Sequence, residues 1–173
     1  YFYTLGCKVN QYESQEMGEL FEKNGYTIIY NIESADVAVV NSCTVTAESV
    51  RKTRQTIRRF RKKNPDCIIV LTGCASQAEK QIIDDLPEVD VFLGNRSNTQ
   101  IVNAVEKFIS ERSKVNMRLE HETGDPFIGT GITRFDGHTR AFLKIQDGCD
   151  RFCSYCLIPT ARGRSRSKSL ELI

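Results

Sequence analysis

Three short apolar runs, each ending at a cysteine, constrain most strongly how this chain can fold. The runs and their cysteines are residues 2–6 with Cys7, residues 37–42 with Cys43, and residues 68–73 with Cys74. Short, nearly continuous runs of this kind are typical of parallel strands that are buried on both faces of a sheet. They therefore predict a parallel sheet with one cysteine just beyond each of three strands.

Helix-start signals follow the three runs. Residues with capping chemistry or capping-box spacing are Asn10 with Glu13, Ser76 with Glu79, and Thr44 or Thr46 before a basic helix. Further strands are predicted over 26–30 and 89–93, with a capping box at 97–100 before an amphipathic helix. Because strands alternate with helices, residues 1–112 are predicted to form an open α/β domain with a parallel sheet.

The alternation brings the three cysteines toward one place. Ligands of open parallel sheets bind beyond the carboxyl ends of the strands, where Cys7, Cys43 and Cys74 are expected. Three thiolates can hold an iron–sulfur cluster and leave one iron open, and the alternative is three unrelated small buried residues. Cys67 precedes its strand, so it is expected at the opposite edge as a small apolar residue.

A second set of cysteines follows a glycine-rich stretch. Residues 113–138 break periodicity and are predicted to be a connector, and residues 141–145 are predicted to be a new strand that leads to the cysteines. Cys149, Cys153 and Cys156 have the spacing C-x3-C-x2-C, which favours a cubane cluster with one open iron. The alternatives are a zinc site completed by a distant ligand such as His138, or ordinary buried thiols.

Composition limits the class of protein. The chain has 173 residues, of which 40% are hydrophobic and 27% charged, as in ordinary globular proteins. No run approaches the roughly 20 apolar residues that a membrane span needs, so no membrane partner is expected. Seven scattered cysteines disfavour a secreted disulfide framework. Reduced thiols that bind metal, and a cytoplasmic location, are predicted.

One segment is strongly basic although the net charge is only +2. Residues 51–63 contain eight Lys and Arg residues and no acid, whereas acids such as Asp84, Asp85, Glu88 and Asp90 lie elsewhere. A concentrated basic helix can track phosphates, and the plainer alternative is a solvated helix face. The candidate RNA contacts in this segment are Arg51, Lys52, Arg54, Arg58 and Arg59.

Together, the two cysteine sets resemble the radical S-adenosylmethionine methylthiotransferases. The motifs that carry the resemblance are LGCKVNQYE (5–13), VNSCTVT (40–46), LTGC (71–74), TRAFLKIQDGC (139–149) and PTARGRSRS (159–167). The sequence is most similar to the subgroup that converts N6-threonylcarbamoyladenosine in tRNA to its 2-methylthio derivative. Sister groups act on isopentenyladenosine in tRNA or on a ribosomal-protein aspartate. A zinc-stabilised RNA-binding module remains as a different class of function.

The resemblance implies two 4Fe–4S clusters and S-adenosylmethionine as cofactors. Cys149, Cys153 and Cys156 would hold the cluster that binds and splits S-adenosylmethionine, with Tyr155 near the cofactor's adenine or packed on the barrel rim. Cys7, Cys43 and Cys74 would hold an auxiliary cluster that carries the sulfur.

The resemblance also implies a fold and partners. Residues 139–173 would be the first strand and cluster loop of a truncated radical S-adenosylmethionine (β/α) partial barrel, so the chain alone is expected to be inactive. The anticodon loop of tRNA would meet the basic segment together with Arg162 and Arg164, for which an exposed loop or barrel-strand edge is the plainer alternative. A flavodoxin or ferredoxin would supply electrons.

Overall fold

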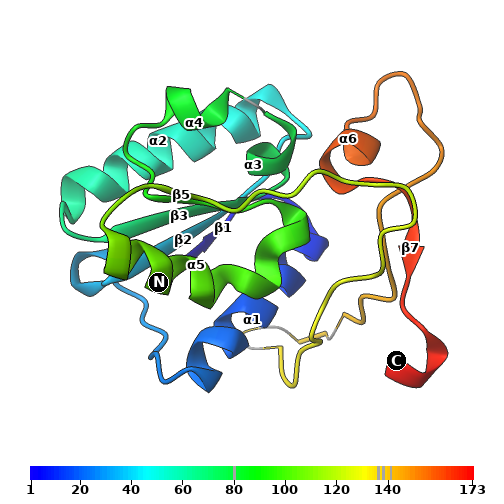
Figure 1. Ribbon diagram of the computed structural model, residues 1–173, viewed down its shortest axis with the longest axis horizontal. Coiled ribbons are helices and arrows are strands. Elements are labelled where there is room, and N and C mark those ends of the chain that lie inside the picture. Colours follow the sequence, from blue (N-terminus) through cyan, green and yellow to red (C-terminus); the bar gives the residue numbers. More distant parts are fainter. Residues whose placement is uncertain (80, 136, 138, 141) are drawn as a thin grey trace.

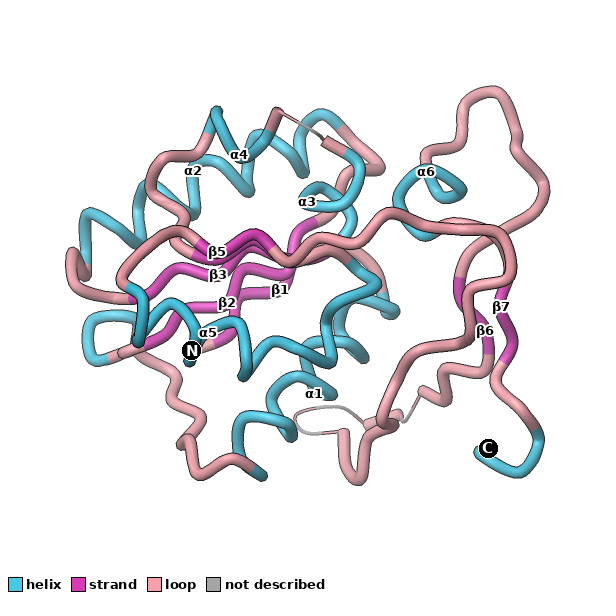
Figure 2. The backbone as a smooth tube through the Cα atoms, viewed as in Figure 1, coloured by secondary structure: helices cyan, strands magenta, loops and turns pink. Residues whose placement is uncertain are grey.

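A parallel sheet forms the centre of the protein (Figure 1, Figure 2). The computed structural model describes residues 1–79, 81–135, 137, 139–140 and 142–173. Within these residues, five parallel strands lie in the order β1-β2-β3-β4-β5. Their bounds are β1 Phe2–Thr4, β2 Val37–Ser42, β3 Ile68–Gly73, β4 Val91–Phe92 and β5 Val115–Asn116. The predicted α/β class with an open parallel sheet is confirmed.

Helices cover both faces of this sheet (Figure 1). Helices α1 (Lys8–Lys23) and α5 (Ile101–Glu111) pack on one face, where Val39 and Val70 point. Helix α2 (Ala47–Lys63) and the short α4 (Ile82–Asp85) pack on the other face, against Val40 and Leu71. Neighbouring strand residues therefore enter opposite cores, which explains why residues 37–40 of β2 and 68–71 of β3 are all apolar.

The remaining elements connect this sandwich to a smaller region beside the sheet. Helix α3 (Cys74–Ala78) follows β3, and the 3-10 helices η1 and η2 span Ile32–Ser34 and Asn95–Gln100. Strands β6 (Gln146–Asp147) and β7 (Arg166–Ser167) pair antiparallel, with α6 (Ile158–Arg162) between them in sequence and η3 (Leu170–Leu172) after them. Helix α6 packs against α3, as Figure 1 shows.

Two predicted strands are wrong. Residues 26–30 form no strand, because Tyr26 and Ile28 reach the core from a loop without backbone pairing in the sheet. Residues 142–145 form none either, and Ala141 lies outside the described residues. Leu143 and Ile145 are 60% and 51% exposed, so no packed layer stabilises an extended strand there. The pairing begins only at Gln146.

One strand at the edge of the sheet was not predicted. Strand β5 lies within the stretch 113–138 that the sequence presents as a connector, and Val115 in it is buried. Two residues carry too little pattern to reveal a strand. The sheet thus extends a few residues past position 112.

The predicted helix starts are correct at one of four positions. Thr46 caps α2 by accepting a hydrogen bond from the Ser49 amide at 3.1 Å. In contrast, α1 begins at Lys8 and α3 at Cys74, so Asn10 and Ser76 lie inside their helices. Ser97 belongs to η2, and α5 begins only at Ile101. Asn10 is not a cap because its side chain is turned into the core, where it contacts β2.

No helix in the described part of the chain is both long enough and apolar enough to cross a membrane.

Candidate functional site

Three cysteines lie along the carboxyl-terminal edge of the sheet. Cys43 and Cys74 directly follow β2 and β3, and Cys7 lies just beyond β1, where it precedes α1. This is the placement that the sequence predicts. Cys43 and Cys74 are buried, whereas Cys7 is exposed. The edge therefore carries two thiols within the protein and one at its surface.

Glycine allows the loop before Cys7 to lie directly against Cys43. Gly6 has φ +106°, and a Cβ atom there would stand 2.8 Å from Cys43 Cβ and 3.1 Å from Cys43 Sγ. Gly73, before Cys74, has φ +91° and would meet the Asn41 side chain at 2.4 Å. A side chain at either position would collide with its neighbours, so glycine is needed to bring the thiol-bearing loops together.

A buried pair of amides ties the Cys7 loop to β2. The Asn10 side chain is 0% exposed, and its Nδ2 donates to Asn41 Oδ1 at 3.0 Å and to the Ser42 carbonyl at 2.9 Å. Its Oδ1 accepts a hydrogen bond from Cys7 Sγ at 3.3 Å. Sequence analysis missed this role, because the spacing of Asn10 from Glu13 indicated a helix cap.

Cys74 is held by a residue from η2. Asn95 Nδ2 lies 3.7 Å from Cys74 Sγ and donates to the Ala161 carbonyl of α6 at 2.8 Å. Burial raises the pKa of the Cys74 thiol, although the Arg162 guanidinium opposes this. Asn95 Oδ1 and Ser76 Oγ are buried and find no hydrogen-bond partner among the described residues. The surroundings of Cys74 thus keep unused polar atoms, which buried sites normally pair.

Cys67 lies away from this edge, as predicted. It is 1% exposed, precedes β3, and lies near the amino-terminal end of the sheet. Burial raises its pKa to about 11. A thiol that stays protonated in this way is a poor metal ligand.

The second cysteine set occupies the loop between β6 and α6. The Cys149 amide donates to the Gly163 carbonyl at 3.1 Å, and the Cys156 amide donates to the Cys153 carbonyl at 2.9 Å. Gly148 has φ +77°, and a Cβ atom there would collide with the Arg164 backbone. The start of the loop therefore lies tightly against the end of α6.

The rest of this loop faces solvent. Cys153 is exposed, and Tyr155 is 87% exposed, so it is not packed on other elements here. Its predicted place near a cofactor stays a prediction. His138, the alternative zinc ligand, lies outside the described residues.

The structure brings the cysteines to shared elements but does not close them around a point. In the described part of the chain, no three His, Cys, Asp or Glu side chains lie close enough together to hold a metal ion. Cys7, Cys43 and Cys74 share a sheet edge, and Cys149, Cys153 and Cys156 share a loop. Their role as ligands stays a prediction.

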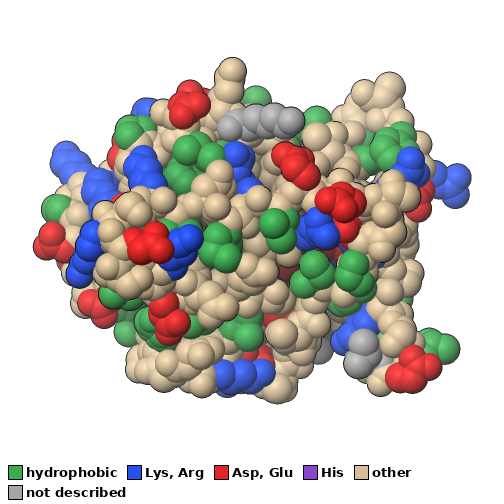
Figure 3. All heavy atoms as spheres, viewed as in Figure 1, with side chains coloured by type: hydrophobic (Ala, Val, Ile, Leu, Met, Phe, Trp, Pro, Cys, Tyr) green, Lys and Arg blue, Asp and Glu red, His purple; other side chains and the backbone are tan. Residues whose placement is uncertain are grey.

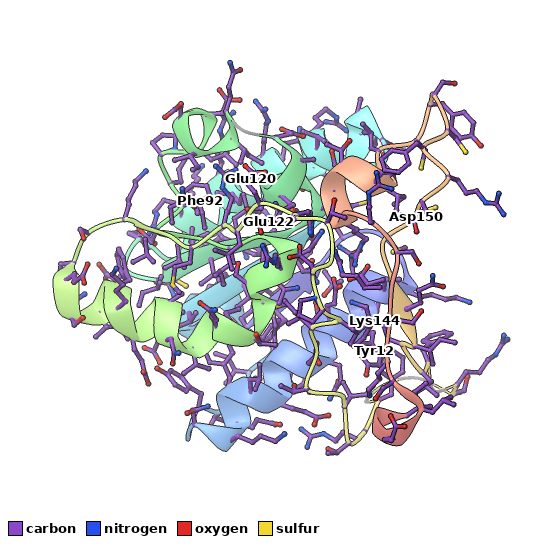
Figure 4. The ribbon with its side chains drawn as sticks, turned by 45° about the vertical axis from the view of Figure 1, so that its right-hand side comes forward. Tyr12, Phe92, Glu120, Glu122, Lys144 and Asp150 are labelled. Atoms are coloured by element: carbon purple, nitrogen blue, oxygen red, sulfur yellow. The ribbon has the colours of Figure 1, made fainter. Side chains whose placement is uncertain are left out.

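A buried group of charged side chains lies at the same end of the sheet, and we call it the charge cluster. It consists of Glu13 of α1, Lys144, Asp147 of β6, and Arg162 of α6. Lys144 Nζ lies 2.7 Å from Glu13 Oε1 and 2.9 Å from Asp147 Oδ2. Arg162 Nη1 lies 2.7 Å from Glu13 Oε1 and 3.0 Å from Asp147 Oδ1. Figure 4 shows Lys144 beside Tyr12 of α1.

All four members of the charge cluster stay ionised in the fold. Burial alone would raise the pKa of Asp147, but Arg162 and Lys144 lower it to about 2. The pKa of Glu13 is also lowered, since the same two cations outweigh its burial. Burial would lower the pKa of Lys144, yet Glu13 and Asp147 raise it. Sequence analysis missed this cluster, because its members are distant in sequence.

Arg162 therefore does not fit the predicted role of an RNA contact. Its side chain is 4% exposed and is bonded to Glu13 and Asp147 inside the protein. A guanidinium held in this way cannot reach a phosphate in solvent. The exposed Arg164, 3.6 Å from Asp150 and stacked over Phe152, keeps its predicted role as a hypothesis.

The cations of α2 are mostly paired with acids. Figure 3 shows Lys and Arg side chains gathered on the α2 side of the molecule, with Asp and Glu side chains among them. The pairs that involve candidate RNA contacts are Arg51 and Lys52 with Glu48, Arg54 with Glu79 and Asp85, and Arg58 with Glu88. Arg59 lies over the rings of Tyr3 and Phe60. This pairing favours the plainer alternative, a solvated face, and RNA contact by α2 stays a prediction.

Comparison with known proteins identifies relatives of the whole chain. The family model described as "Uncharacterized protein family UPF0004" matches residues 1–94. Proteins named threonylcarbamoyladenosine tRNA methylthiotransferase MtaB are 39% identical in Bacillus subtilis (strain 168) and 37% identical in Aquifex aeolicus (strain VF5). The alignments cover 98% and 99% of this chain, and 38% and 42% of those proteins.

A second kind of relative is less similar. A protein of Syntrophus aciditrophicus (strain SB) named tRNA-2-methylthio-N(6)-dimethylallyladenosine synthase is 29% identical over 99% of this chain and 38% of its own length. The chain thus spans about two fifths of the length of the curated relatives that it matches. It is homologous to tRNA methylthiotransferases over nearly all of its own length.

Proposed function

This chain belongs to protein family UPF0004, and we propose that its protein adds a methylthio group to N6-threonylcarbamoyladenosine next to the anticodon of tRNA. The observation that carries this proposal is the similarity to the MtaB proteins, at 39% and 37% identity. The similarity to the dimethylallyladenosine synthase is lower, at 29%. The threonylcarbamoyl substrate is therefore favoured over the dimethylallyl one.

The residues on the sheet edge fit an iron–sulfur cofactor in their chemistry. Thiols are the usual ligands of such clusters, and Cys7, Cys43 and Cys74 would hold the auxiliary one. Gly6 leaves no side chain between the Cys7 loop and Cys43 Sγ, and Asn95 Nδ2 is a hydrogen-bond donor 3.7 Å from Cys74 Sγ. Cys149, Cys153 and Cys156 would hold a second cluster, to which S-adenosylmethionine binds. When bound, the two clusters would supply the sulfur and the reductive cleavage of S-adenosylmethionine.

Residues of the chain itself position these thiols. Asn10 holds the Cys7 loop to the end of β2, and Asn95 holds Cys74 to α6. The Cys149 amide anchors the second loop at Gly163. These bonds fix where each loop begins, while the exposed Cys7 and Cys153 remain accessible to an incoming cofactor.

The proposal includes partners of the whole protein. The anticodon loop of tRNA is the proposed substrate surface, because bases in loops can be turned outward and stacked. The exposed cations proposed to face it are Arg51, Lys52, Arg58, Arg59 and Arg164. A flavodoxin or ferredoxin would supply electrons, and the cytoplasm is the proposed location.

Nucleoside mass spectrometry tests the substrate. We expect tRNA from a strain that lacks the gene to lose the 2-methylthio mark on N6-threonylcarbamoyladenosine, and the whole protein to restore it. Retention of that mark, with loss of the mark on isopentenyladenosine or on a ribosomal-protein aspartate, would assign the protein to a sister group.

Metal analysis tests the cofactors. We expect about eight irons and a matching amount of sulfide in the anaerobically reconstituted whole protein, which corresponds to two cubane clusters. One zinc without sulfide would instead support an RNA-binding module with a structural metal.

A further inference from the structure

Arg162 comes from a distant part of the sequence to the carboxyl-terminal edge of the sheet. We call this edge, which carries Cys7, Cys43 and Cys74, the thiol edge. It ends α6, yet its guanidinium bonds both carboxylate oxygens of Glu13 in α1, with Nη1–Oε1 at 2.7 Å and Nη2–Oε2 at 3.0 Å. A third bond joins Nη1 to Asp147 Oδ1 at 3.0 Å. A bidentate arginine of this kind has a fixed plane and a fixed direction.

The guanidinium of Arg162 also reaches Asn10, the residue that bonds the thiol of Cys7. Nη2 lies 3.4 Å from Asn10 Oδ1, the same oxygen that accepts the hydrogen bond from Cys7 Sγ. The positive charge of Arg162 opposes the rise that burial causes in the pKa of Cys74, and α6 packs on α3, which begins at Cys74. One amide thus separates Arg162 from Cys7, and the helix that Arg162 ends packs against the helix that begins at Cys74.

Buried charges of both signs surround Arg162. Three cations, Lys144, Arg162 and Arg166, lie within ion-pair distance of the carboxylates of Glu13 and Asp147. Glu16, one turn along α1 from Glu13, accepts a hydrogen bond from the Gly131 amide at 2.8 Å, and its carboxylate also interacts with the charge of Lys144. Of these three cations, Arg162 is the one that bonds Asn10.

A positive charge that is fixed and shielded from water favours an anionic occupant. A cluster held by three thiolates is such an occupant, because each thiolate carries a negative charge. The cost of burying Arg162 and Glu13 gives the arrangement no obvious advantage for stability alone, since buried ion pairs are often no more stabilising than apolar residues.

We propose that Arg162 is a positioning residue that supplies the positive charge beside the N-terminal thiols Cys7, Cys43 and Cys74, under the control of Glu13. This inference rests on the proposed function. Its consequence is that the N-terminal thiol site is complete only when the segment from Lys144 to Arg166 is docked on α1. The two cysteine sets are then coupled through one shared arginine, because α6 directly follows the loop of the second set.

Two substitutions that change the local charge in opposite directions test the proposal. The whole protein is used with Cys149, Cys153 and Cys156 changed to alanine, so that only the N-terminal thiols can hold a cluster. After anaerobic reconstitution, iron and sulfide content and the midpoint potential of the cluster are measured by redox titration with electron paramagnetic resonance. Glu13→Gln removes a negative charge, and Arg162→Gln removes a positive one.

We expect the two midpoint potentials to move in opposite directions. Glu13→Gln should raise the potential and Arg162→Gln should lower it, each by a tenfold change in the reduction equilibrium, which is 59 mV for one electron. Arg162→Lys, which keeps the charge, should stay close to the parent protein. A purely structural role predicts loss of iron in both variants without opposite shifts.

A matched ion pair at the opposite end of the sheet is the control. Arg61 Nη2 lies 2.6 Å from Asp90 Oδ2, and Arg61→Gln should leave the potential unchanged. Equal potentials, or shifts in the same direction, in Glu13→Gln and Arg162→Gln overturn the inference. If Arg162→Gln fails to fold, the other two variants carry the test. A raised potential in Glu13→Gln with an unchanged potential in Arg162→Lys supports the inference, and any other result overturns it. Failure of the parent protein to bind iron at these thiols overturns the proposed function itself.

Discussion

At the residue scale, the thiol edge depends on two glycines, because a side chain at either position would not fit. Gly6 and Gly73 have positive φ angles and lie where any Cβ would collide with Cys43 or with Asn41. Asn10 and Asn95 then orient the thiols of Cys7 and Cys74 through single hydrogen bonds. Small residues thus decide how near the cysteines come, and amides decide how they are held.

Gly6→Ala should destabilise the fold by about 3 kcal/mol, because it adds backbone strain to a collision with Cys43. Chemical denaturation of the protein measures this change. Gly25→Ala is the matched control, since Gly25 has φ +84° but nothing within 4 Å of its hypothetical Cβ. Its cost should be only about 1 kcal/mol, from strain alone. Equal costs for both variants would show that Gly6 is not in close contact with Cys43.

Cys67→Ala should leave the iron content of the reconstituted protein unchanged, because Cys67 is buried at the opposite end of the sheet with a raised pKa. Cys74→Ala should remove the iron of one cluster. Iron and sulfide analysis of the two variants in parallel is the measurement. Loss of iron in Cys67→Ala would show that our assignment of the auxiliary ligands is incorrect.

At the element scale, α1 organises the molecule through one row of carboxylates. Glu13, Glu16 and Glu19 are spaced by three residues and are all buried, although acids on a helix are normally exposed. Glu13 belongs to the charge cluster, while Glu16 and Glu19 accept hydrogen bonds from residues 130–134. Residues 130–134 therefore lie along α1, as the yellow stretch beside that helix in Figure 1 shows.

Glu19→Gln should loosen the stretch 130–134 and lower the free energy of unfolding by about 1.5 kcal/mol at neutral pH. Glu19 accepts hydrogen bonds from the Thr133 amide and hydroxyl and from the Arg134 amide. Burial would raise the pKa of Glu19, but these donors lower it below 4.5.

The lowered pKa gives this contribution a definite pH dependence. It is fully present above the unfolded pKa of 4.5 and is lost as the pH falls through the lower folded pKa. The difference in unfolding midpoint between the wild type and Glu19→Gln should therefore shrink from about pH 6 to about pH 3. Thermal unfolding across this range measures it, and a difference that grows toward acid would contradict the bonding described here.

At the scale of the whole molecule, the charge cluster fastens the region from residue 142 onward to the sheet. Its members come from α1, β6, α6 and the segment before β6. Because one cation or carboxylate alone would be buried without compensation, the cluster works only as a whole. Docking of this region and formation of the cluster are thus one event.

Lys144→Met should lower the free energy of unfolding by about 3 kcal/mol, because it leaves the carboxylates of Glu13 and Asp147 with one partner fewer. Lys107→Met is the control: Lys107 lies 3.9 Å from Glu111 with both side chains half exposed. Its cost should stay within about 0.5 kcal/mol. Denaturant titration, with limited proteolysis of the region after residue 142, compares the two. Similar stability of both variants would show that the cluster does not hold this region.

The local pattern of the sequence was sufficient for the sheet and for the placement of the cysteines on it. Apolar runs specify strands because a strand between two helical layers must be apolar on both sides, and parallel strands necessarily share one carboxyl-terminal edge. Cys7, Cys43 and Cys74 could therefore be assigned to that edge without a structure. Thr46 was found in the same way, since a helix cap is a local interaction.

Only the tertiary structure decided which polar residues are buried and with whom they pair. Arg162 looked like a surface cation, but it meets Glu13 from 149 residues away. The spacing of Asn10 indicated a cap, whereas its amide joins two thiol-bearing loops. A charge or an amide can be buried only where its partner arrives, and no local pattern records a partner so far along the chain.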